Sequence, residues 1–180
     1  MSYRPDSQIT TLVIHYSATP IEHDYSCNDI DRIHRKRGFN GTGYHIYIRK
    51  DGSEEFGRDL SEPGRFEQGA HSKGENDTSI GICYEGGVSA SDTNLGFDSR
   101  TPEQIATMIK VIDRLQCRFV GSIVEGHRDM PGAATQCPGF NARLWWDSVL
   151  AERNKPKEDS IYKLLTTFLG QLVSSFGGRY

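Results

Sequence analysis

In two segments of the chain, an apolar run is followed by residues of types that bind metal ions. Residues 14–20 carry His15, and residues 125–138 carry His127 and Cys137. Imidazole nitrogen and thiolate sulfur are ligands that zinc prefers, and a catalytic zinc site uses three protein ligands with the fourth position open to water or substrate. Because the three residues come from well-separated segments, they predict a catalytic zinc site.

The ordinary alternative is that these are unrelated polar residues. A histidine at the end of a strand is more often a hydrogen-bonded polar residue than a metal ligand. The chain also lacks compact metal motifs such as Cys-x-x-Cys or His-Glu-x-x-His. The spacing of the three residues therefore gives a weak case by itself, and the rest of the chain must support it.

Several short motifs follow one another between about Thr10 and Trp146 in an order that resembles the zinc N-acetylmuramoyl-L-alanine amidases. They read Ile-His-Tyr-Ser-Ala-Thr, Gly-Tyr-His-Ile-Tyr-Ile followed by Asp-Gly, Gly-Ala-His-Ser-Lys-Gly-Glu-Asn, Ser-Ile-Gly-Ile-Cys-Tyr-Glu-Gly-Gly, Thr-Pro-Glu-Gln, and Gly-His-Arg-Asp…Cys-Pro-Gly-Phe. The chain is similar to the branch that contains phage T7 lysozyme and the animal peptidoglycan-recognition proteins. This resemblance implies a mixed sheet, one Zn²⁺ ion, and hydrolysis of the amide between muramic acid and L-alanine of the stem peptide in peptidoglycan.

The resemblance also implies two catalytic residues. Tyr44 matches a family tyrosine whose hydroxyl donates to the oxyanion near the zinc; a tyrosine that only packs in a strand is the lesser alternative. Thr135 stands where T7-type members have lysine and active recognition proteins have threonine, so its hydroxyl is expected to bond the substrate carbonyl or the zinc water. Position 83, a glutamate in other bacterial branches, is Cys83 here. We therefore assign no general base and note Glu85 as a carboxylate to test.

Peptidoglycan needs a long groove with polar and charged contacts. His71, Lys73, Asn76 and Arg65 lie in loops that match the groove of the relatives, and they are the predicted substrate-binding residues. Arg58 and Arg128 are further candidates. The alternative for each charged residue is a solvated position on a loop. His34 and His45 are expected to be structural.

The composition predicts one soluble catalytic domain. The chain has 180 residues, of which 36% are hydrophobic and 25% charged, enough for one sizeable core. The net charge is −3 and the cationic residues are dispersed along the chain, so the sequence does not indicate a basic patch for binding nucleic acid. We expect a monomer whose partner is peptidoglycan.

The pattern of elements predicts a mixed α/β fold. Residues 9–16, 79–84 and 123–126 read as strands, and Asp51-Gly52 predicts a hairpin after a strand over residues 44–49. Ser26 and Thr101 are predicted N-caps of helices, the first ending at Gly38 and the second carrying an apolar stripe at Ile105, Met108, Ile109, Ile112 and Leu115. The expected architecture is a central mixed sheet flanked by helices, with the zinc site at one edge.

The N-terminus lacks the apolar run of a signal peptide, which predicts synthesis in the cytoplasm. Because peptidoglycan lies outside the inner membrane, the resemblance favours a phage or prophage endolysin that acts on the cell wall or periplasm after release. A recycling or wall-remodelling amidase is the lesser alternative. Cys27, Cys83 and Cys117 are expected to be structural thiols, the last two buried.

Residues 151–180 are predicted to lie outside the catalytic domain of residues 1–150. A charged linker precedes an apolar helical stripe that begins at Ile161. We expect this C-terminal helix to contact its own domain, a partner or the membrane interface. Two functions compete with lysis: binding peptidoglycan without cleaving it, and regulating a polymerase. Retention of all three ligands speaks against the first.

Overall fold

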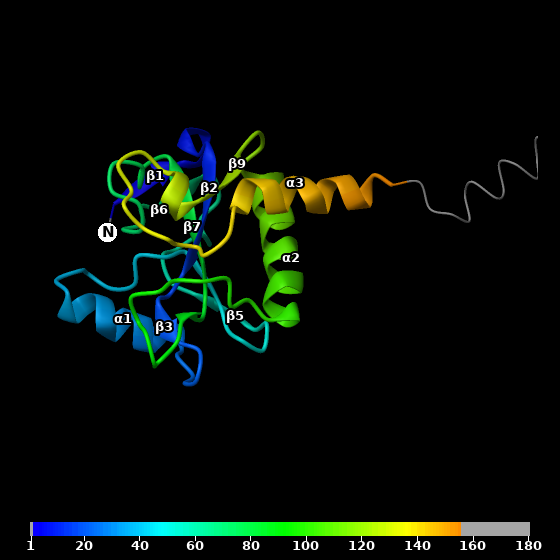
Figure 1. Ribbon diagram of the computed structural model, residues 1–180. Coiled ribbons are helices and arrows are strands. Elements are labelled where there is room, and N and C mark those ends of the chain that lie inside the picture. Colours follow the sequence, from blue (N-terminus) through cyan, green and yellow to red (C-terminus); the bar gives the residue numbers. More distant parts are fainter. Residues whose placement is uncertain (1, 156–180) are drawn as a thin grey trace, which may run out of the picture. The chain divides into compact units, whose positions relative to one another are not determined.

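The computed structural model describes residues 2–155, and a five-stranded sheet forms its centre (Figure 1). The strand order is β5-β4-β7-β2-β9. These strands are β2 (Thr11–Tyr16), β4 (Ile46–Ile48), β5 (Glu54–Phe56), β7 (Ser79–Tyr84) and β9 (Ile123–Gly126). All neighbouring pairs are parallel except the β4–β5 hairpin, which is antiparallel. The predicted mixed sheet is therefore confirmed.

Two small ribbons that the sequence did not predict join distant segments. β1 (Tyr3–Pro5) pairs antiparallel with β6 (Arg65–Glu67), and β3 (Thr19–Pro20) pairs parallel with β8 (Gly87–Val88). Short 3₁₀ turns, η1 (Asp6–Gln8) and η2 (His127–Asp129), follow β1 and β9. The second turn begins with a predicted metal ligand.

The register of the central strands assigns side chains to the two faces of the sheet. His15, Cys83 and Tyr47 are neighbours across β2, β7 and β4, so they share one face. Cys27 and Ile30 of helix α1 (Cys27–Lys36) belong to the same buried cluster as Cys83 and Tyr47. His15, a predicted metal ligand, therefore lies on the face that α1 covers.

Helix α2 (Pro102–Arg118) lies on the opposite side of the sheet from α1 (Figure 1). Its buried residues include Met108, Val111, Ile112 and Leu115. The predicted stripe is correct for Met108, Ile112 and Leu115. Ile105 and Ile109 are only half-buried, whereas Gln104 and Val111, which the prediction did not include, are buried.

The predicted helix ends are confirmed. The side chains of Ser26 and Thr101 each accept a hydrogen bond from the third helical amide. In return, the side chains of Asp29 and Gln104 accept a hydrogen bond from the backbone amide of the capping residue. Gly38 has φ of +90° after α1, and the amide of Phe39 bonds back to the carbonyl of His34. This is the Schellman arrangement that glycine favours.

One cysteine departs from the prediction. Cys27 and Cys83 are buried, but Cys117 is exposed, because its position near the end of α2 faces away from the residues that pack on the sheet. All four cysteines are free thiols.

Residues 1–145 form one compact unit, and helix α3 (Ala142–Arg153) begins in it. From Trp146 onward the chain belongs to a second unit. The predicted C-terminal helix that begins at Ile161 lies outside the described residues, so the domain boundary at residue 150 stays a prediction. Within residues 2–155, none of the helices combines the length and apolarity needed to cross a membrane.

Candidate metal centre

Parallel strands bring the two predicted histidine ligands together. β2 and β9 are neighbours, and their register ends at Ile14 opposite Gly126, so His15 and His127 follow side by side at the same end of the sheet. Their ring centroids are 4.6 Å apart. Cys137 arrives from the loop after η2, and one ligand atom from each of the three residues lies within 4.8 Å of the others. Within the described part of the chain, no other group of three or more His, Cys, Asp or Glu residues is arranged in this way.

The thiol of Cys137 is held by backbone groups. Its Sγ accepts a hydrogen bond from the Tyr16 amide at 3.3 Å and lies 3.7 Å from Nδ1 of His15. Thr135 Oγ1 accepts the Cys137 amide at 3.1 Å, and the Cys137 carbonyl accepts the Arg128 amide at 2.7 Å. Thr135 thus shapes the ligand loop. The hydrogen bond from the Tyr16 amide could not be read from the sequence, because a backbone amide is present whatever the residue type.

The segment after Cys137 is anchored by aromatic and cationic side chains. Tyr84 donates its hydroxyl to the Pro138 carbonyl at 2.7 Å. The Arg100 guanidinium lies 3.3 Å from the centre of the Phe140 ring and is paired with Asp98. Gly139 has φ of +87°, and a Cβ there would lie 2.3 Å from the backbone of Phe97. These contacts fix the loop that carries Cys137, the predicted cysteine ligand.

Burial shifts the pKa values of the three predicted ligands. It lowers the pKa of His15 well below the usual value, with His71 and His127 adding to the effect, and it also lowers the pKa of His127. Both imidazoles are therefore neutral and can offer a lone pair. Burial raises the pKa of Cys137 to about 12, against the opposing effect of the Tyr16 amide. Without a cation the group is a thiol, and metal binding would release its proton.

Tyr44 lies beside the ligands. Its ring centroid is 5.1 Å from that of His15, and the phenol interacts with the Cys83 thiol. Burial raises the pKa of Tyr44 well above its usual value, and Cys83 and Cys137 contribute to the shift. The phenol stays protonated and is thus available as a hydrogen-bond donor.

A cavity of about 370 Å³ adjoins the predicted metal ligand His127 and contains three of the predicted substrate-binding residues. It is lined by Phe39, Ala70, His71, Ser72, Lys73, Asn76 and His127. Asn76 Oδ1 accepts the amides of His71 and Ser72 at 2.8 and 2.9 Å, so it also holds the loop. Phe39 was not identified from the sequence, since it follows a helix stop with no motif of its own.

The other polar candidates have partners elsewhere. Arg65 is paired with Glu62, stacks on Tyr3, and does not line this cavity. Arg58 is bound to Glu67 and to the Thr42 carbonyl. The Arg128 guanidinium lies 3.8 Å from Asp129.

Glu85 is a buried structural carboxylate. One oxygen accepts the Tyr25 amide, and the other accepts Arg49 Nε at 3.0 Å and the Lys50 amide at 2.9 Å. Both oxygens are occupied and do not join the metal-binding group, so Glu85 is not positioned to act as the base.

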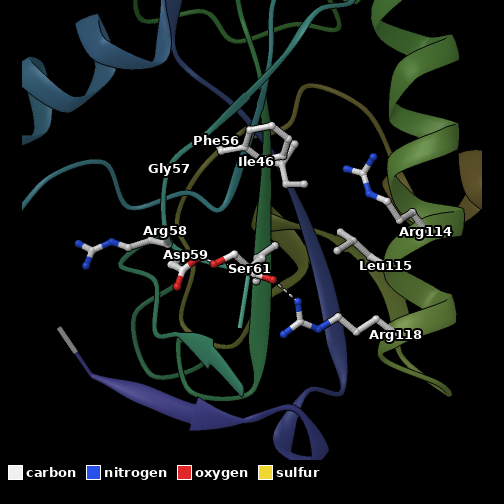
Figure 2. Close-up of a pocket in the computed structure, with 10 residues that line it drawn as sticks. Ile46, Phe56, Gly57, Arg58, Asp59, Ser61, Arg114, Leu115 and Arg118 are labelled. Carbon is white, nitrogen blue, oxygen red and sulfur yellow. Dashed lines mark hydrogen bonds between the residues drawn. The ribbon is translucent and has the colours of Figure 1, made fainter. Parts of the chain in front are cut away.

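A second cavity, of about 550 Å³, lies between α2 and the β4–β5 hairpin. Figure 2 shows Arg114, Leu115 and Arg118 across it from Ile46 and Phe56. Arg114 is paired with Glu54, and Arg118 with Asp6 and three backbone carbonyls. Its lining offers apolar contacts and arginines that are already satisfied, and it contains none of the predicted ligands.

Comparisons with known proteins agree with the geometry. Residues 5–140 match the family model described as N-acetylmuramoyl-L-alanine amidase. The endolysin of Enterobacteria phage T3 is 31% identical over 82% of this chain and 91% of its own length.

Solved structures give the same result. The N-acetylmuramoyl-L-alanine amidase LysC from Clostridium intestinale superposes with a TM-score of 0.65 at 28% identity, covering 86% of this chain and 91% of the other. Peptidoglycan recognition protein SD of Drosophila shares the fold, with a TM-score of 0.63 at 20% identity over 82% and 85% of the two chains. The chain belongs to the N-acetylmuramoyl-L-alanine amidase family and is a phage-type member of it.

Proposed function

We propose that this amidase depends on Zn²⁺ held by His15, His127 and Cys137 and that it acts as a phage or prophage endolysin. The amide between N-acetylmuramic acid and L-alanine of peptidoglycan is the bond it hydrolyses. One observation carries the zinc assignment: donor atoms from three segments far apart in sequence converge within 4.8 Å of one another.

The chemistry of the donor set fits zinc. Two neutral imidazoles and one thiolate are borderline ligands that suit Zn²⁺ better than the oxygen-seeking Mg²⁺ or Ca²⁺. Three protein ligands leave a coordination position for water or substrate, as catalytic sites require. When bound, zinc would polarise the scissile carbonyl and make hydroxide available near neutral pH.

The surrounding residues support amide hydrolysis. The protonated phenol of Tyr44, beside His15, is a donor for the negative charge that develops on the carbonyl oxygen. Thr135 would act chiefly by holding the Cys137 loop, since its hydroxyl accepts the Cys137 amide. The cavity beside His127 would receive the muropeptide, with Lys73 and Asn76 as polar contacts.

The site of action follows from the substrate. Peptidoglycan lies in the cell wall, and the similar phage proteins are named endolysins. We propose that the chain reaches the wall after release from the cell interior, acts there without a nucleic-acid partner, and works as a monomer.

The test combines metal analysis with product identification. Purified peptidoglycan is digested and the products are analysed by mass spectrometry; new free L-alanine amino termini identify the bond. The protein should carry about one zinc per chain, as an open three-ligand site implies. His15→Ala, His127→Ala and Cys137→Ala should each lose zinc and hydrolysis.

Matched controls come from residues of the same types outside the site. His23 and Cys117 are exposed, so His23→Ala and Cys117→Ala should keep full zinc and activity. Full zinc content in folded Cys137→Ala would remove that residue from the site. Cleavage within the glycan strand, or no cleavage, would contradict the proposed reaction.

A further inference from the structure

We propose that His71 is a positioning residue that fixes the proton of His15 and thereby aims its Nδ1 at the metal. This inference rests on the proposed zinc site. It gives the Gly-Ala-His segment a role within the protein that is separate from substrate contact.

The two ring nitrogens of His15 face different partners. Nδ1 lies 3.7 Å from the Cys137 thiol, on the metal side. Nε2 lies 3.1 Å from Nδ1 of His71. A neutral imidazole has one N–H and one lone pair, so a metal at Nδ1 requires the proton on Nε2. Nδ1 of His71 is the acceptor for that proton.

Metal-binding histidines almost always donate the other ring N–H to a carboxylate, a carbonyl or water. Here a second histidine takes that place. Both rings are buried, at 1% and 8% exposure for His15 and His71, so bulk water does not compete for the bond. Burial lowers the pKa of His71 well below its usual value, and the ring is neutral and able to accept.

The ring of His71 packs closely against the backbone of two glycines. A Cβ added at Gly81 of β7 would lie 2.6 Å from its Cγ, and one added at Gly69 would lie 2.6 Å from its Cδ2. On the backbone side, Asn76 Oδ1 binds the amides of His71 and Ser72. A glycine within a strand often marks such a close approach. The two glycines and Asn76 together hold the acceptor in place.

The remaining nitrogen of His71 completes the assignment. Nε2 is buried and has no hydrogen-bond partner of normal geometry among the described residues. Nδ1 is the ring nitrogen that lies 3.1 Å from His15, so it must carry the lone pair when His15 is the donor. A proton on Nε2 leaves the lone pair of His71 on Nδ1, facing His15.

The experiment measures zinc affinity by competition with a chromophoric chelator. His71→Leu removes the acceptor and should weaken zinc binding by about 10- to 100-fold, the usual effect of losing a partner of a metal ligand. His71→Asn puts an amide oxygen where Nδ1 was and should keep most of the affinity. His34→Leu is the control, because it removes another buried acceptor, for the Gly43 amide, that does not touch His15. It should bind zinc as the wild type does.

A second measurement does not depend on a variant that folds. Long-range ¹H–¹⁵N spectra of the zinc-loaded wild type should show His15 protonated at Nε2 and bound to metal at Nδ1. Metal at Nε2 of His15 would overturn the proposal, and so would a folded His71→Leu variant with unchanged zinc affinity. If the wild type binds no zinc, the proposed function fails as well. The wild-type titration therefore separates the two failures.

Discussion

At the scale of single residues, the proposed metal centre combines side chains whose protonation is shifted in opposite directions by burial. Burial keeps His15 neutral and ready to bind, whereas it keeps Cys137 protonated until a cation arrives. Binding of the proposed zinc should therefore release about one proton from the thiol at neutral pH. Tyr44 is also held protonated, which suits a donor and excludes a base.

The clearest residue-scale prediction concerns Tyr44. Tyr44→Phe should keep the fold and the zinc while lowering kcat by about 10²- to 10³-fold, the usual effect of deleting one oxyanion donor. Turnover of soluble muropeptides and metal analysis measure the two effects. Tyr25→Phe is a matched control from the same cluster, and it should leave turnover unchanged. Equal turnover in the two variants would make Tyr44 a packing residue.

The sequence identified the residues with distinctive chemistry better than their partners. His15, His127 and Cys137 were named because few residue types bind zinc, and the structure brings them together. Arg65 was named from its loop, but its pairing with Glu62 depends on a local arrangement that no motif encodes. Contacts through backbone groups, such as the Tyr16 amide on Cys137, are independent of residue type and could not be predicted.

At the scale of elements, the helices and strands with strong local sequence signals were predicted, and those with weak signals were not. Capping boxes placed the starts of α1 and α2, because the caps satisfy amides that otherwise lack partners. The central strands were predicted from runs of apolar residues. The β1–β6 and β3–β8 ribbons were missed, since segments of two or three residues carry no periodicity.

The cap of α2 gives a prediction at this scale. Thr101 Oγ1 accepts the Gln104 amide at 3.1 Å and donates to the Lys50 carbonyl at 2.7 Å. Thr101→Val keeps the shape and removes both bonds, which should cost about 1–2 kcal/mol and lower Tm by about 2–8 °C. Calorimetry on the full chain measures the shift.

A control within the same helix makes the cap prediction specific. Thr107 Oγ1 donates a single bond, to the Gly52 carbonyl at 2.7 Å. Thr107→Val should therefore lower Tm less than Thr101→Val does. Identical shifts would mean that the cap adds nothing beyond one ordinary hydrogen bond.

At the scale of the whole molecule, the domain buries several neutral histidines. His45 is fully enclosed: its Nδ1 accepts the Gly81 amide at 3.0 Å, and its Nε2 donates to the Glu67 carbonyl at 2.9 Å. Burial lowers its pKa from 6.5 to about 4. The unfolded chain therefore takes up a proton at a higher pH than the folded chain does.

This difference fixes the sign of a stability change with pH. The contribution of His45 is complete above pH 6.5 and is lost as pH falls to about 4, which amounts to about 3 kcal/mol of unfolding free energy. Urea unfolding of the zinc-free protein across this range measures the slope. His45→Gln, which does not titrate there, should have a shallower slope. Parallel slopes for the two proteins would show that His45 is not the cause.

The placing of β2 between β7 and β9 also affects the order of events while the chain is being made. Strand β2 leaves the ribosome early, but its partners are residues 79–84 and 123–126, and the cysteine ligand comes later still. Parallel neighbours so distant in sequence cannot pair until the intervening chain has been synthesised. A nascent chain that ends before Cys137 lacks one of the three proposed ligands, so we expect synthesis of nearly the whole domain to precede binding of the proposed metal.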